Sequence, residues 1–379
     1  MRIAHIFHHY YPSFGGLEKT IQSLAEEQAK LGHEVYVVTT AYGAKGRPKT
    51  EVINEVCVHR VKSIRLHFPD LTIPLEIPYN VLKKVDIVQC YSQNSLFTYI
   101  TCEKAKKIGK PVVFYFIGVE YLRYHHNSVK RIFGYFYQRY ITNKVCKIAD
   151  LILTTNEYEK QLLKSTHNVD AVVIPHGINQ VYLKIPNRAD KFRSKYNIQG
   201  MIIAYIGRLH PSKGVDILIR AFRRVIEFTP HVILVIVGRG NEGYVRKIKT
   251  LVKALNLEDQ VRILGYIPEI DKIGLIDASE VIILPSRHRG ESYPLVIDEA
   301  KARGKPLIVT NTGALPFRVK HGVEGFVIPS EHEKMLAEAI IRIASGNKSQ
   351  LLIKSRGILT WGNITLKILK LYRNLLYNA

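Results

Sequence analysis

The sequence predicts an α/β protein built from two doubly wound parallel-sheet domains. Short apolar runs alternate with helical patterns along all 379 residues, which is the pattern of strand–helix–strand units. Several runs are continuous and β-branched, such as VILVIV at 232–237, and such runs are typical of strands buried on both faces of a parallel sheet. Because a single core rarely grows beyond ~250–300 residues, this length also favours two domains.

The expected strands form two series, one in each half of the chain. The first lies at 2–7, 34–40, 55–61, 86–92, 111–117, 150–156 and 170–174, and the second at 201–207, 232–238, 261–267, 280–286, 306–312 and 325–328. Apolar residues at helical spacing, for example within 217–226, predict the connecting helices. The pattern breaks near 175–179, so we expect domains at 1–175 and 176–360 that face a cleft. In such sheets ligands bind at the carboxyl ends of the strands.

The end of the chain, 361–379, has the pattern of one more helix with many apolar residues. A helix this apolar must cover another surface. The simplest partner is the C-terminal domain itself.

The chain carries a large positive net charge, +23 at neutral pH. Such a field attracts nucleic acid, an anionic membrane face or phosphorylated substrates. The sign of the charge does not choose between these partners, and solubility alone is a further explanation.

The four cysteines, Cys57, Cys90, Cys102 and Cys146, have no CxxC spacing, so neither a zinc site nor a thioredoxin-like motif is indicated. The chain begins directly with an expected strand and shows no signal-peptide pattern. No apolar stretch approaches the ~20 residues that span a bilayer. We therefore expect a cytoplasmic protein whose cysteines are reduced packing residues.

Two basic residues follow the first strand of the second half. Gly207 ends this strand, Arg208 comes next, and Lys213 stands just before the helical stripe at 217–226. A glycine at a strand end lets a ligand approach the backbone, and an arginine with a lysine suits a diphosphate. Two exposed cations on a turn are the alternative explanation.

A second candidate segment follows the expected strand 280–286. Glu291 lies in a loop, Ser292 is placed to cap the next helix, and Pro294 suits its first turn. Glu299 lies inside that helix. A carboxylate pair around a helix start can bind sugar hydroxyls while the backbone amides hold phosphate. The alternative is that both glutamates are ordinary surface charges.

A third segment, Gly15 and Gly16, follows the first strand and precedes a helix. Paired glycines there form a loop that a ligand can approach closely, although a flexible turn explains them equally well.

Together these segments resemble the GT4 family of retaining glycosyltransferases, which has the two-domain GT-B fold. The resemblance extends over nearly the whole chain. It rests on Gly15–Gly16 with Glu18, the link 174–179 (IPHGIN), Gly207–Arg208 with Lys213–Gly214, the Glu291/Glu299 pair, and the tail from Trp361 to Tyr372. The set in this order is specific, whereas each piece alone is not.

The resemblance implies a glycosyltransferase that moves a sugar from a nucleotide-diphosphate donor, with retention of anomeric configuration, to a lipid-linked or glycan acceptor. It places the donor in the C-terminal domain and the acceptor on the side of 1–175. It also implies that the helix 361–379 crosses back to this N-terminal domain.

The resemblance further implies a role for each candidate residue. Arg208 and Lys213 would hold the diphosphate, Glu299 the ribose and Glu291 the transferred sugar, with Arg208, Lys213 and Glu291 as the catalytic groups. The remaining donor contacts would come from Gly15, Gly16, Gly207, the turn at Tyr266 and Ile267 for the base, and the amides near Leu295 and Val296. Fixed cations and helix amides stabilise the charge that develops on a leaving diphosphate. No Asp-x-Asp sequence occurs, so we expect neither a metal nor a cofactor.

Three positions depart from the family pattern. Ile117 stands where members usually carry histidine, and Ala314 and Phe317 replace a glycine and an acid. These changes affect the expected sugar and acceptor pocket and leave the diphosphate segment intact. A non-catalytic relative that binds nucleotide sugar is therefore an alternative.

The segment 121–147 contains six basic residues and seven aromatic ones, with no acidic residue. Basic residues beside aromatic rings suit an anionic membrane interface, and this agrees with a lipid-linked acceptor and a peripheral membrane location. A core helix with solvated charges is the next alternative. A nucleic acid, bound through phosphates and stacked bases, is the least favoured.

Overall fold

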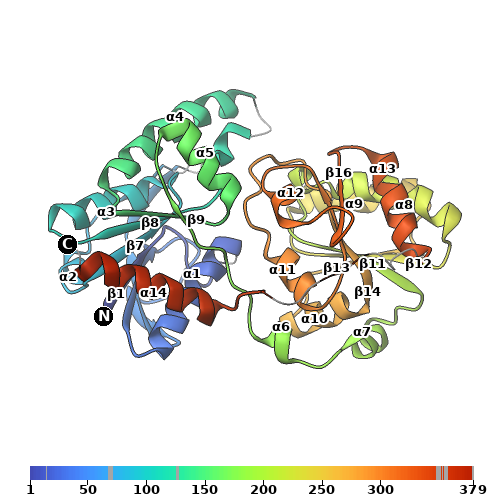
Figure 1. The fold of residues 1–379 in the computed structure, drawn as a ribbon, viewed down its shortest axis with the longest axis horizontal. Coiled ribbons are helices and arrows are strands. Elements are labelled where there is room, and N and C mark those ends of the chain that lie inside the picture. Colours follow the sequence, from blue (N-terminus) through green and yellow to red (C-terminus); the bar gives the residue numbers. More distant parts are fainter. Residues whose placement is uncertain are drawn as a thin grey trace. The chain divides into compact units, whose positions relative to one another are not determined.

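The structure, a computed structural model, describes residues 1–13, 15–66, 71–124, 128–346, 351, 353 and 357–377. The chain forms two compact units (Figure 1). Unit 1 comprises Met1–Gly177 together with Leu359–Ala379, and unit 2 comprises Ile178–Ile358. Each unit is an α/β layer structure built on one main sheet.

Unit 1 contains an eight-stranded sheet in the order β10-β9-β8-β7-β1-β2-β4-β3. Its strands are β1 (Arg2–Ile6), β2 (Glu34–Thr40), β3 (Thr50–Ile53), β4 (Val56–Val61), β7 (Ile87–Tyr91), β8 (Val112–Phe116), β9 (Leu151–Thr154) and β10 (Val172–Val173). All neighbours are parallel except the edge strand β3, which pairs antiparallel with β4. A separate antiparallel pair is formed by β5 (Ser63–Leu66) and β6 (Leu71–Pro74).

Helices cover both faces of this sheet (Figure 1). They are α1 (Gly16–Lys30), α2 (Tyr79–Leu82), α3 (Leu96–Lys107), α4 (Ser128–Ile148), α5 (Glu157–His167), α14 (Trp361–Tyr377) and the short 3-10 helix η1 (Tyr121–Tyr124). Ile6 and Phe114 of the strands share a core with Phe97 of α3, Val145 of α4 and Leu163 of α5. None of the helices in the described ranges is both long and apolar enough to span a bilayer.

The C-terminal helix α14 belongs to unit 1 and lies beside α1 (Figure 1). Its apolar stripe, which includes Trp361, Ile364 and Ile368, is buried. A side chain at Gly177 would place its Cβ atom 2.4 Å from the backbone nitrogen of Trp361, so glycine is required where the chain leaves unit 1. The expected crossing back of the tail to the N-terminal unit is therefore confirmed. Residues 378–379 lie outside the described ranges.

Unit 2 contains a fully parallel six-stranded sheet in the order β13-β12-β11-β14-β15-β16. Its strands are β11 (Met201–Ile206), β12 (Val232–Val237), β13 (Val261–Gly265), β14 (Ser279–Leu284), β15 (Leu307–Thr310) and β16 (Gly325–Ile328). Its helices are α6 (Val181–Lys184), α7 (Ala189–Tyr196), η2 (Pro211–Lys213), α8 (Val215–Phe228), α9 (Glu242–Ala254), α10 (Glu269–Ala278), α11 (Leu295–Ala302), α12 (Leu315–Arg318) and α13 (Glu333–Ala344).

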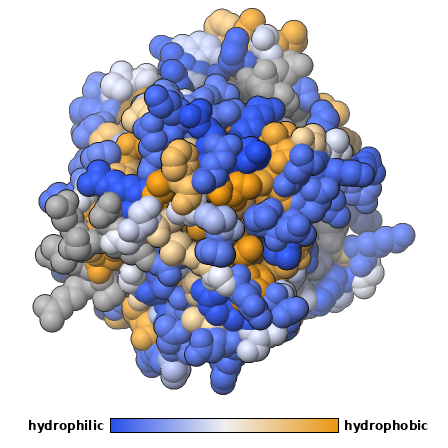
Figure 2. All heavy atoms as spheres, turned by 90° about the vertical axis from the view of Figure 1, so that its right-hand side faces the viewer, coloured by the Kyte–Doolittle hydropathy of each residue, from blue (hydrophilic) through white to orange (hydrophobic). Residues whose placement is uncertain are grey.

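Alternate residues of β11 face opposite sides of the sheet. Ile203 and Tyr205 pack with α8, α9 and α13, whereas Ile202 and Ala204 pack with α7, α10 and α11. Both faces are therefore buried, which explains why these strands are continuous apolar runs. The side of unit 2 that is turned to the viewer in Figure 2 is mostly hydrophilic, with hydrophobic side chains between.

Most of the expected strands are confirmed within one or two residues, and the stripe at 217–226 lies inside α8. The strands β3, β5 and β6 were not predicted. Each has only four residues, and β3 (TEVI) carries two polar ones. Short edge strands of this kind carry little periodic signal.

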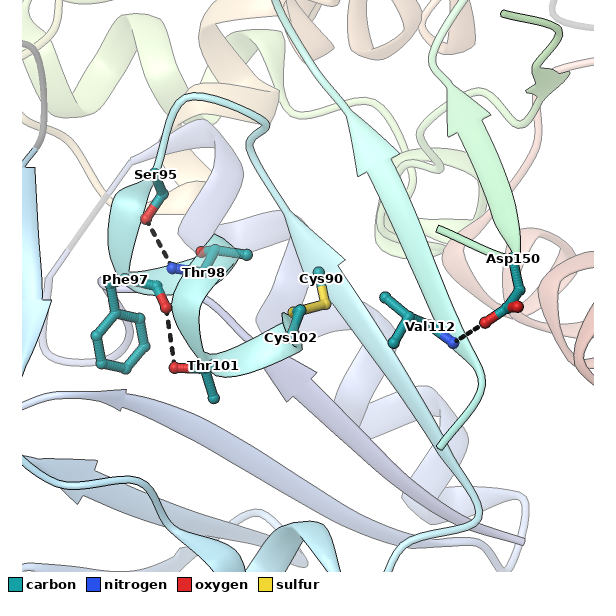
Figure 3. The surroundings of a disulfide bond; sticks show 8 residues. All are labelled: Cys90, Ser95, Phe97, Thr98, Thr101, Cys102, Val112 and Asp150. Carbon is teal, nitrogen blue, oxygen red and sulfur yellow. Dashed lines mark hydrogen bonds between the residues drawn. A yellow bond between two sulfur atoms is a disulfide. The ribbon is translucent and has the colours of Figure 1, made fainter. Parts of the chain in front are cut away.

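The expectation that all cysteines are reduced is wrong for one pair. Cys90 of β7 and Cys102 of α3 form a disulfide, and their Cα atoms lie 6.9 Å apart (Figure 3). The side chains meet because α3 packs on β7 after Ser95 caps its first turn by accepting the Thr98 N–H. A separation of 12 residues matches no sequence motif, so the pairing depends on the tertiary fold. Cys57 and Cys146 are free.

Candidate functional site

Gly207 and Arg208 follow the central strand β11 of unit 2. The Gly207 N–H donates to the Val237 carbonyl at 3.0 Å, and the Tyr205 hydroxyl donates to the Arg208 carbonyl at 2.7 Å. Gly238 has a φ of 149°, and a Cβ atom there would lie 1.7 Å from the Gly207 carbonyl oxygen. The backbone around Arg208 is thus fixed on both sides, while its side chain extends into solvent.

Lys213 ends η2 and precedes α8. Gly214, which follows it, has a φ of 69°, and a Cβ atom there would lie 1.9 Å from the Pro285 carbonyl oxygen. This close approach places Lys213 beside the loop that leaves β14. The Lys213 ammonium forms an ion pair with Glu291, whose side chain is only 8% exposed, while that of Lys213 is 21% exposed.

Glu291 is held ionised by its neighbours. Burial disfavours the charge, but the Lys213 ammonium and the Ser286 hydroxyl, which donates to Oε1 at 3.0 Å, outweigh burial and lower the pKa of Glu291. The Ala314 N–H donates to the Glu291 carbonyl at 2.8 Å. The adjacent Gly313 has no room for a side chain, because a Cβ atom would lie 2.4 Å from that same carbonyl oxygen.

His288 lies within the field of the same charges. Burial is the main reason that its pKa falls to about 4, and the positive charges of Lys213 and Arg208 add to the shift. The charges of Arg208, Lys213 and Glu291 therefore all act on His288, and the ion pair joins Lys213 directly to Glu291. The sequence analysis did not select His288, whose only signal was its place in the loop after β14.

The first turn of α11 has no side-chain cap. The helix begins at Leu295, and its N-cap residue, Pro294, offers no capping side chain. The expectation that Ser292 caps this helix is therefore wrong, because Ser292 lies two residues before the N-cap position. The first amides of a helix, here those of Leu295 and Val296, lack intrahelical partners and are suited to bind an anion.

Glu299 lies on the buried side of α11 in a second cluster. Lys272 of α10 contacts Glu299 Oε1 at 2.9 Å and Glu269 Oε1 at 3.0 Å. Burial disfavours the ammonium, but the two carboxylates outweigh it and raise the pKa of Lys272. Among the described residues, no ion pair or hydrogen bond joins Glu299 to Arg208 or Lys213. Glu291 precedes α11 and Glu299 lies within it, so the chain itself connects the Lys213–Glu291 cluster to the Lys272–Glu299 cluster.

Lys272 was missed in the sequence analysis. Lys272 lies among the buried apolar residues of α10. A charged side chain in such a place needs a partner of opposite charge, and this could have indicated the residue in the sequence.

Tyr266 and Ile267 follow β13. Ile267 is buried, whereas Tyr266 is 64% exposed, and the Arg239 guanidinium lies 4.3 Å from the centre of its ring. The pair forms a flat, cationic surface that can stack on an aromatic base. Arg239 was also missed, although it follows β12 as closely as Arg208 follows β11.

The remaining selected residues belong to unit 1. Gly15 is the extended N-cap residue of α1 and Gly16 begins this helix. Ile117, at the end of β8, is half-buried. The next two amides, those of Gly118 and Val119, donate to Glu159 Oε1 at 2.6 and 3.3 Å, so a buried carboxylate that the sequence analysis missed fixes the loop.

Helix α4 turns an apolar face to solvent. Val129, Ile132, Phe133, Phe136 and Tyr140 are each more than half exposed. Lys130, Arg131, Arg139, Lys144 and Lys147 are exposed on the same helix, which contains no acidic residue. The opposite face, which includes Ile141 and Val145, is buried in unit 1, so α4 carries apolar side chains on both its buried and its exposed side. Residues 125–127 of the expected interface 121–147 lie outside the described ranges.

No group of three or more His, Cys, Asp or Glu side chains is placed to hold a metal ion, as far as the described ranges extend.

Two family models match successive parts of the chain. Residues 14–181 match "Glycosyltransferase Family 4", and residues 187–358 match "Glycosyl transferases group 1". The protein therefore belongs to the GT4-type glycosyltransferases, and its fold is GT-B.

Several known proteins resemble the whole chain. An uncharacterized glycosyltransferase of Methanocaldococcus jannaschii is 28% identical over 91% of this chain and 89% of its own length. The phosphatidylinositol N-acetylglucosaminyltransferase GPI3 subunit of Saccharomyces cerevisiae is 22% identical over 98% of this chain and 83% of its own.

Solved structures share the fold over the full length. Sucrose-phosphate synthase of Thermosynechococcus elongatus superposes with a TM-score of 0.82 at 22% identity, covering 100% of both chains. HepE of Anabaena, in complex with UDP-glucose, gives 0.77 at 20% identity and covers 99% of this chain and 100% of its own. At these identities the likeness shows the fold alone.

Proposed function

We propose that the protein transfers a sugar from a nucleotide-diphosphate donor that unit 2 binds. The observation that carries this proposal is the convergence of Arg208, Lys213 and Glu291 after two neighbouring strands, next to the uncapped start of α11. Two cations and free helix amides at the carboxyl edge of a parallel sheet match the chemistry of a diphosphate.

The proposed reaction breaks the bond between the anomeric carbon of the sugar and the terminal phosphate oxygen. An acceptor hydroxyl oxygen forms the new bond to that carbon, and its proton passes to the departing nucleoside diphosphate. Negative charge grows on the departing phosphate oxygen, and Arg208, Lys213 and the amides of Leu295 and Val296 stabilise it where it develops. The backbone at Arg208 and the Lys213–Glu291 pair are already in place before the donor arrives, which reduces the reorganisation that binding requires. The same cations take the place of a metal ion in the proposed mechanism. Retention of anomeric configuration is proposed from membership of the family.

The other donor contacts follow from the two clusters. Glu291 contacts hydroxyl groups of the transferred sugar, and its ion pair keeps it a carboxylate that accepts hydrogen bonds. Glu299 accepts hydrogen bonds from the ribose hydroxyls, and its ion pair with Lys272 holds it in place. The base stacks near Tyr266 and Arg239. Gly207 allows close approach of the donor in unit 2, and Gly15 and Gly16 are the proposed contacts from unit 1.

The proposed acceptor is lipid-linked or a glycan at a membrane surface. The support is the solvent-facing apolar side of α4 with its exposed basic residues, because aromatic rings and cations together favour an anionic interface. The name of the yeast relative describes transfer to a phosphatidylinositol lipid, and the Anabaena structure contains UDP-glucose. We propose peripheral attachment to the cytoplasmic face of a membrane through this helix.

A thermal-shift screen against nucleotide-diphosphate sugars, followed by a donor-turnover assay, tests the proposal. The correct donor should raise the unfolding midpoint of the wild type, because it binds only the native state. Lys213→Met should lose both the shift and turnover. The matched control is Lys249→Met, which makes the same change on the exposed face of α9 and should behave like the wild type.

Binding without turnover towards any lipid or glycan extract would favour the non-catalytic alternative that Ile117 raises. Equal shifts in the wild type and in Lys213→Met would show that this site does not bind the donor.

A further inference from the structure

Unit 1 contains a polar cavity that the donor site does not use. It has a volume of about 270 Å³ and lies where η1, α4 and the end of α5 meet. Two arginines, Arg123 and Arg139, line it together with one carboxylate, Glu120, and with Tyr135 and His167. A solvent-open cavity with two guanidinium groups is suited to an anion with several oxygen atoms.

The carboxylate of Glu120 is already occupied. One of its oxygens accepts from Arg123 at 2.8 Å and the other from the Tyr124 hydroxyl at 3.1 Å. The Arg123 guanidinium also lies 5.5 Å from the centre of the Tyr135 ring. Arg123 is therefore held in place, and its charge is balanced by Glu120.

Arg139 supplies the unbalanced charge of this cavity. It forms no ion pair or hydrogen bond with any residue that the structure describes, and its side chain is exposed. His167 adds no charge at neutral pH, because burial, assisted by the nearby Arg139, lowers its pKa. Its Nδ1 atom lies 2.7 Å from Asn143 Oδ1. The charge of Arg139 is thus left for a ligand.

The cavity is adjacent to the exposed apolar face of α4. Arg139 lies three residues after Phe136 and seven after Ile132, and these spacings place the side chains on neighbouring lines of one helix face. Where aromatic side chains lie in a membrane interface, they sit at the level of the lipid headgroups. If α4 docks in this way, the opening beside Arg139 lies at the depth of the lipid phosphates.

We propose that the cavity between η1, α4 and α5 binds the headgroup phosphate of an anionic phospholipid, with Arg139 as its main ligand. This site rests on the proposed membrane attachment and is distinct from the donor site in unit 2. In addition to the general attraction between a basic protein and an anionic surface, the site would provide one specific contact with a lipid phosphate. Such a contact would fix the rotation of α4 about its axis at the membrane.

The test compares Arg139→Gln with Arg131→Gln in the full-length protein. Both changes remove one arginine charge from the exposed surface of α4, but Arg131 does not line the cavity. Binding is measured by co-sedimentation with vesicles of phosphatidylcholine, with and without phosphatidic acid. Glycerol 3-phosphate is then added as a soluble competitor, with sodium chloride at matched ionic strength as its control. Binding of the nucleoside diphosphate that the thermal-shift screen selects shows, for each variant, that unit 2 is intact.

We expect Arg139→Gln to reduce binding to the phosphatidic acid vesicles at least about tenfold, and Arg131→Gln to reduce it only about fivefold, as loss of one non-specific surface charge would. Glycerol 3-phosphate should displace the wild type and Arg131→Gln more strongly than the salt control does. It should have no such extra effect on Arg139→Gln.

An equal loss of vesicle binding in Arg139→Gln and Arg131→Gln, with no displacement by glycerol 3-phosphate beyond that of salt, would overturn the proposal. It would show that the basic surface attracts the membrane uniformly. Binding of glycerol 3-phosphate by a wild type that ignores every vesicle would assign the cavity to a free phosphate and would also refute the proposed membrane attachment. Failure of the wild type to bind any nucleoside diphosphate would count against the donor site alone.

Discussion

Replacing Lys213 by methionine should destabilise unit 2 because it leaves a buried carboxylate without its counter-ion. Methionine keeps most of the side-chain stem, so the change mainly removes the charge. Breaking a buried ion pair from one side costs about 3–5 kcal/mol. We expect about 3 kcal/mol, since Lys213 is 21% exposed and the Ser286 hydroxyl still donates to Glu291.

This loss should depend on pH with a defined sign. In the wild type the pKa of Glu291 is lowered below its ordinary value of 4.5, so the pair stabilises the fold above that value and less as the pH falls through the folded-state pKa. In Lys213→Met, burial becomes the dominant influence and raises the pKa of Glu291. The carboxyl group can then take up a proton on mild acidification, and the difference between variant and wild type should shrink.

Urea unfolding followed by circular dichroism at about pH 7 and about pH 5 measures both effects. The double variant Lys213→Met/Glu291→Gln should recover at least half of the loss, because it removes both charges together. A cost below about 1 kcal/mol at both pH values, typical of an exposed ion pair, would refute the reasoning.

Three further predictions concern other parts of the two units. Tyr266→Ala should weaken nucleotide binding about fivefold by calorimetry, because a stacking surface worth about 1 kcal/mol is lost, and should leave kcat unchanged; a loss confined to kcat would contradict the assignment. Lys272→Met should raise the donor KM about tenfold by releasing Glu299, whereas an unchanged KM would mean that Glu299 does not contact the donor. Trp361→Ala should destabilise unit 1 by about 3–5 kcal/mol in urea without changing the affinity for the nucleoside diphosphate that the thermal-shift screen selects, and a stability equal to the wild type would show that α14 is not packed.

Much of the fold could be predicted because its signals are local. The run 232–237 is apolar and β-branched throughout, and it forms a central strand with both faces buried. The four-residue strand β3 lacks such a signal, because it pairs on one side only and has no fully buried residue. Its position depends on the neighbouring strand β4 and not on its own sequence.

The site was predictable as far as each residue follows a strand end. Arg208 stands just after β11, and Glu291 lies in the loop between β14 and α11, at the sheet edge where parallel sheets bind ligands. The partners of the two glutamates were not predictable. Lys272 contacts Glu299 and Ser286 donates to Glu291, and only tertiary packing brings these residues together. The disulfide between Cys90 and Cys102 has the same cause. The capping prediction failed at Ser292 because sequence patterns locate helix ends only within a few residues.

A crystal structure of the protein with the nucleoside diphosphate selected by the thermal-shift screen tests the central claim most directly. We predict that the diphosphate oxygens lie within hydrogen-bond distance of Arg208, Lys213 and the first amides of α11. We also predict that Lys213 divides its contacts between the ligand and Glu291. A diphosphate bound elsewhere, with the Lys213–Glu291 pair undisturbed and α11 still without a ligand, would contradict the account.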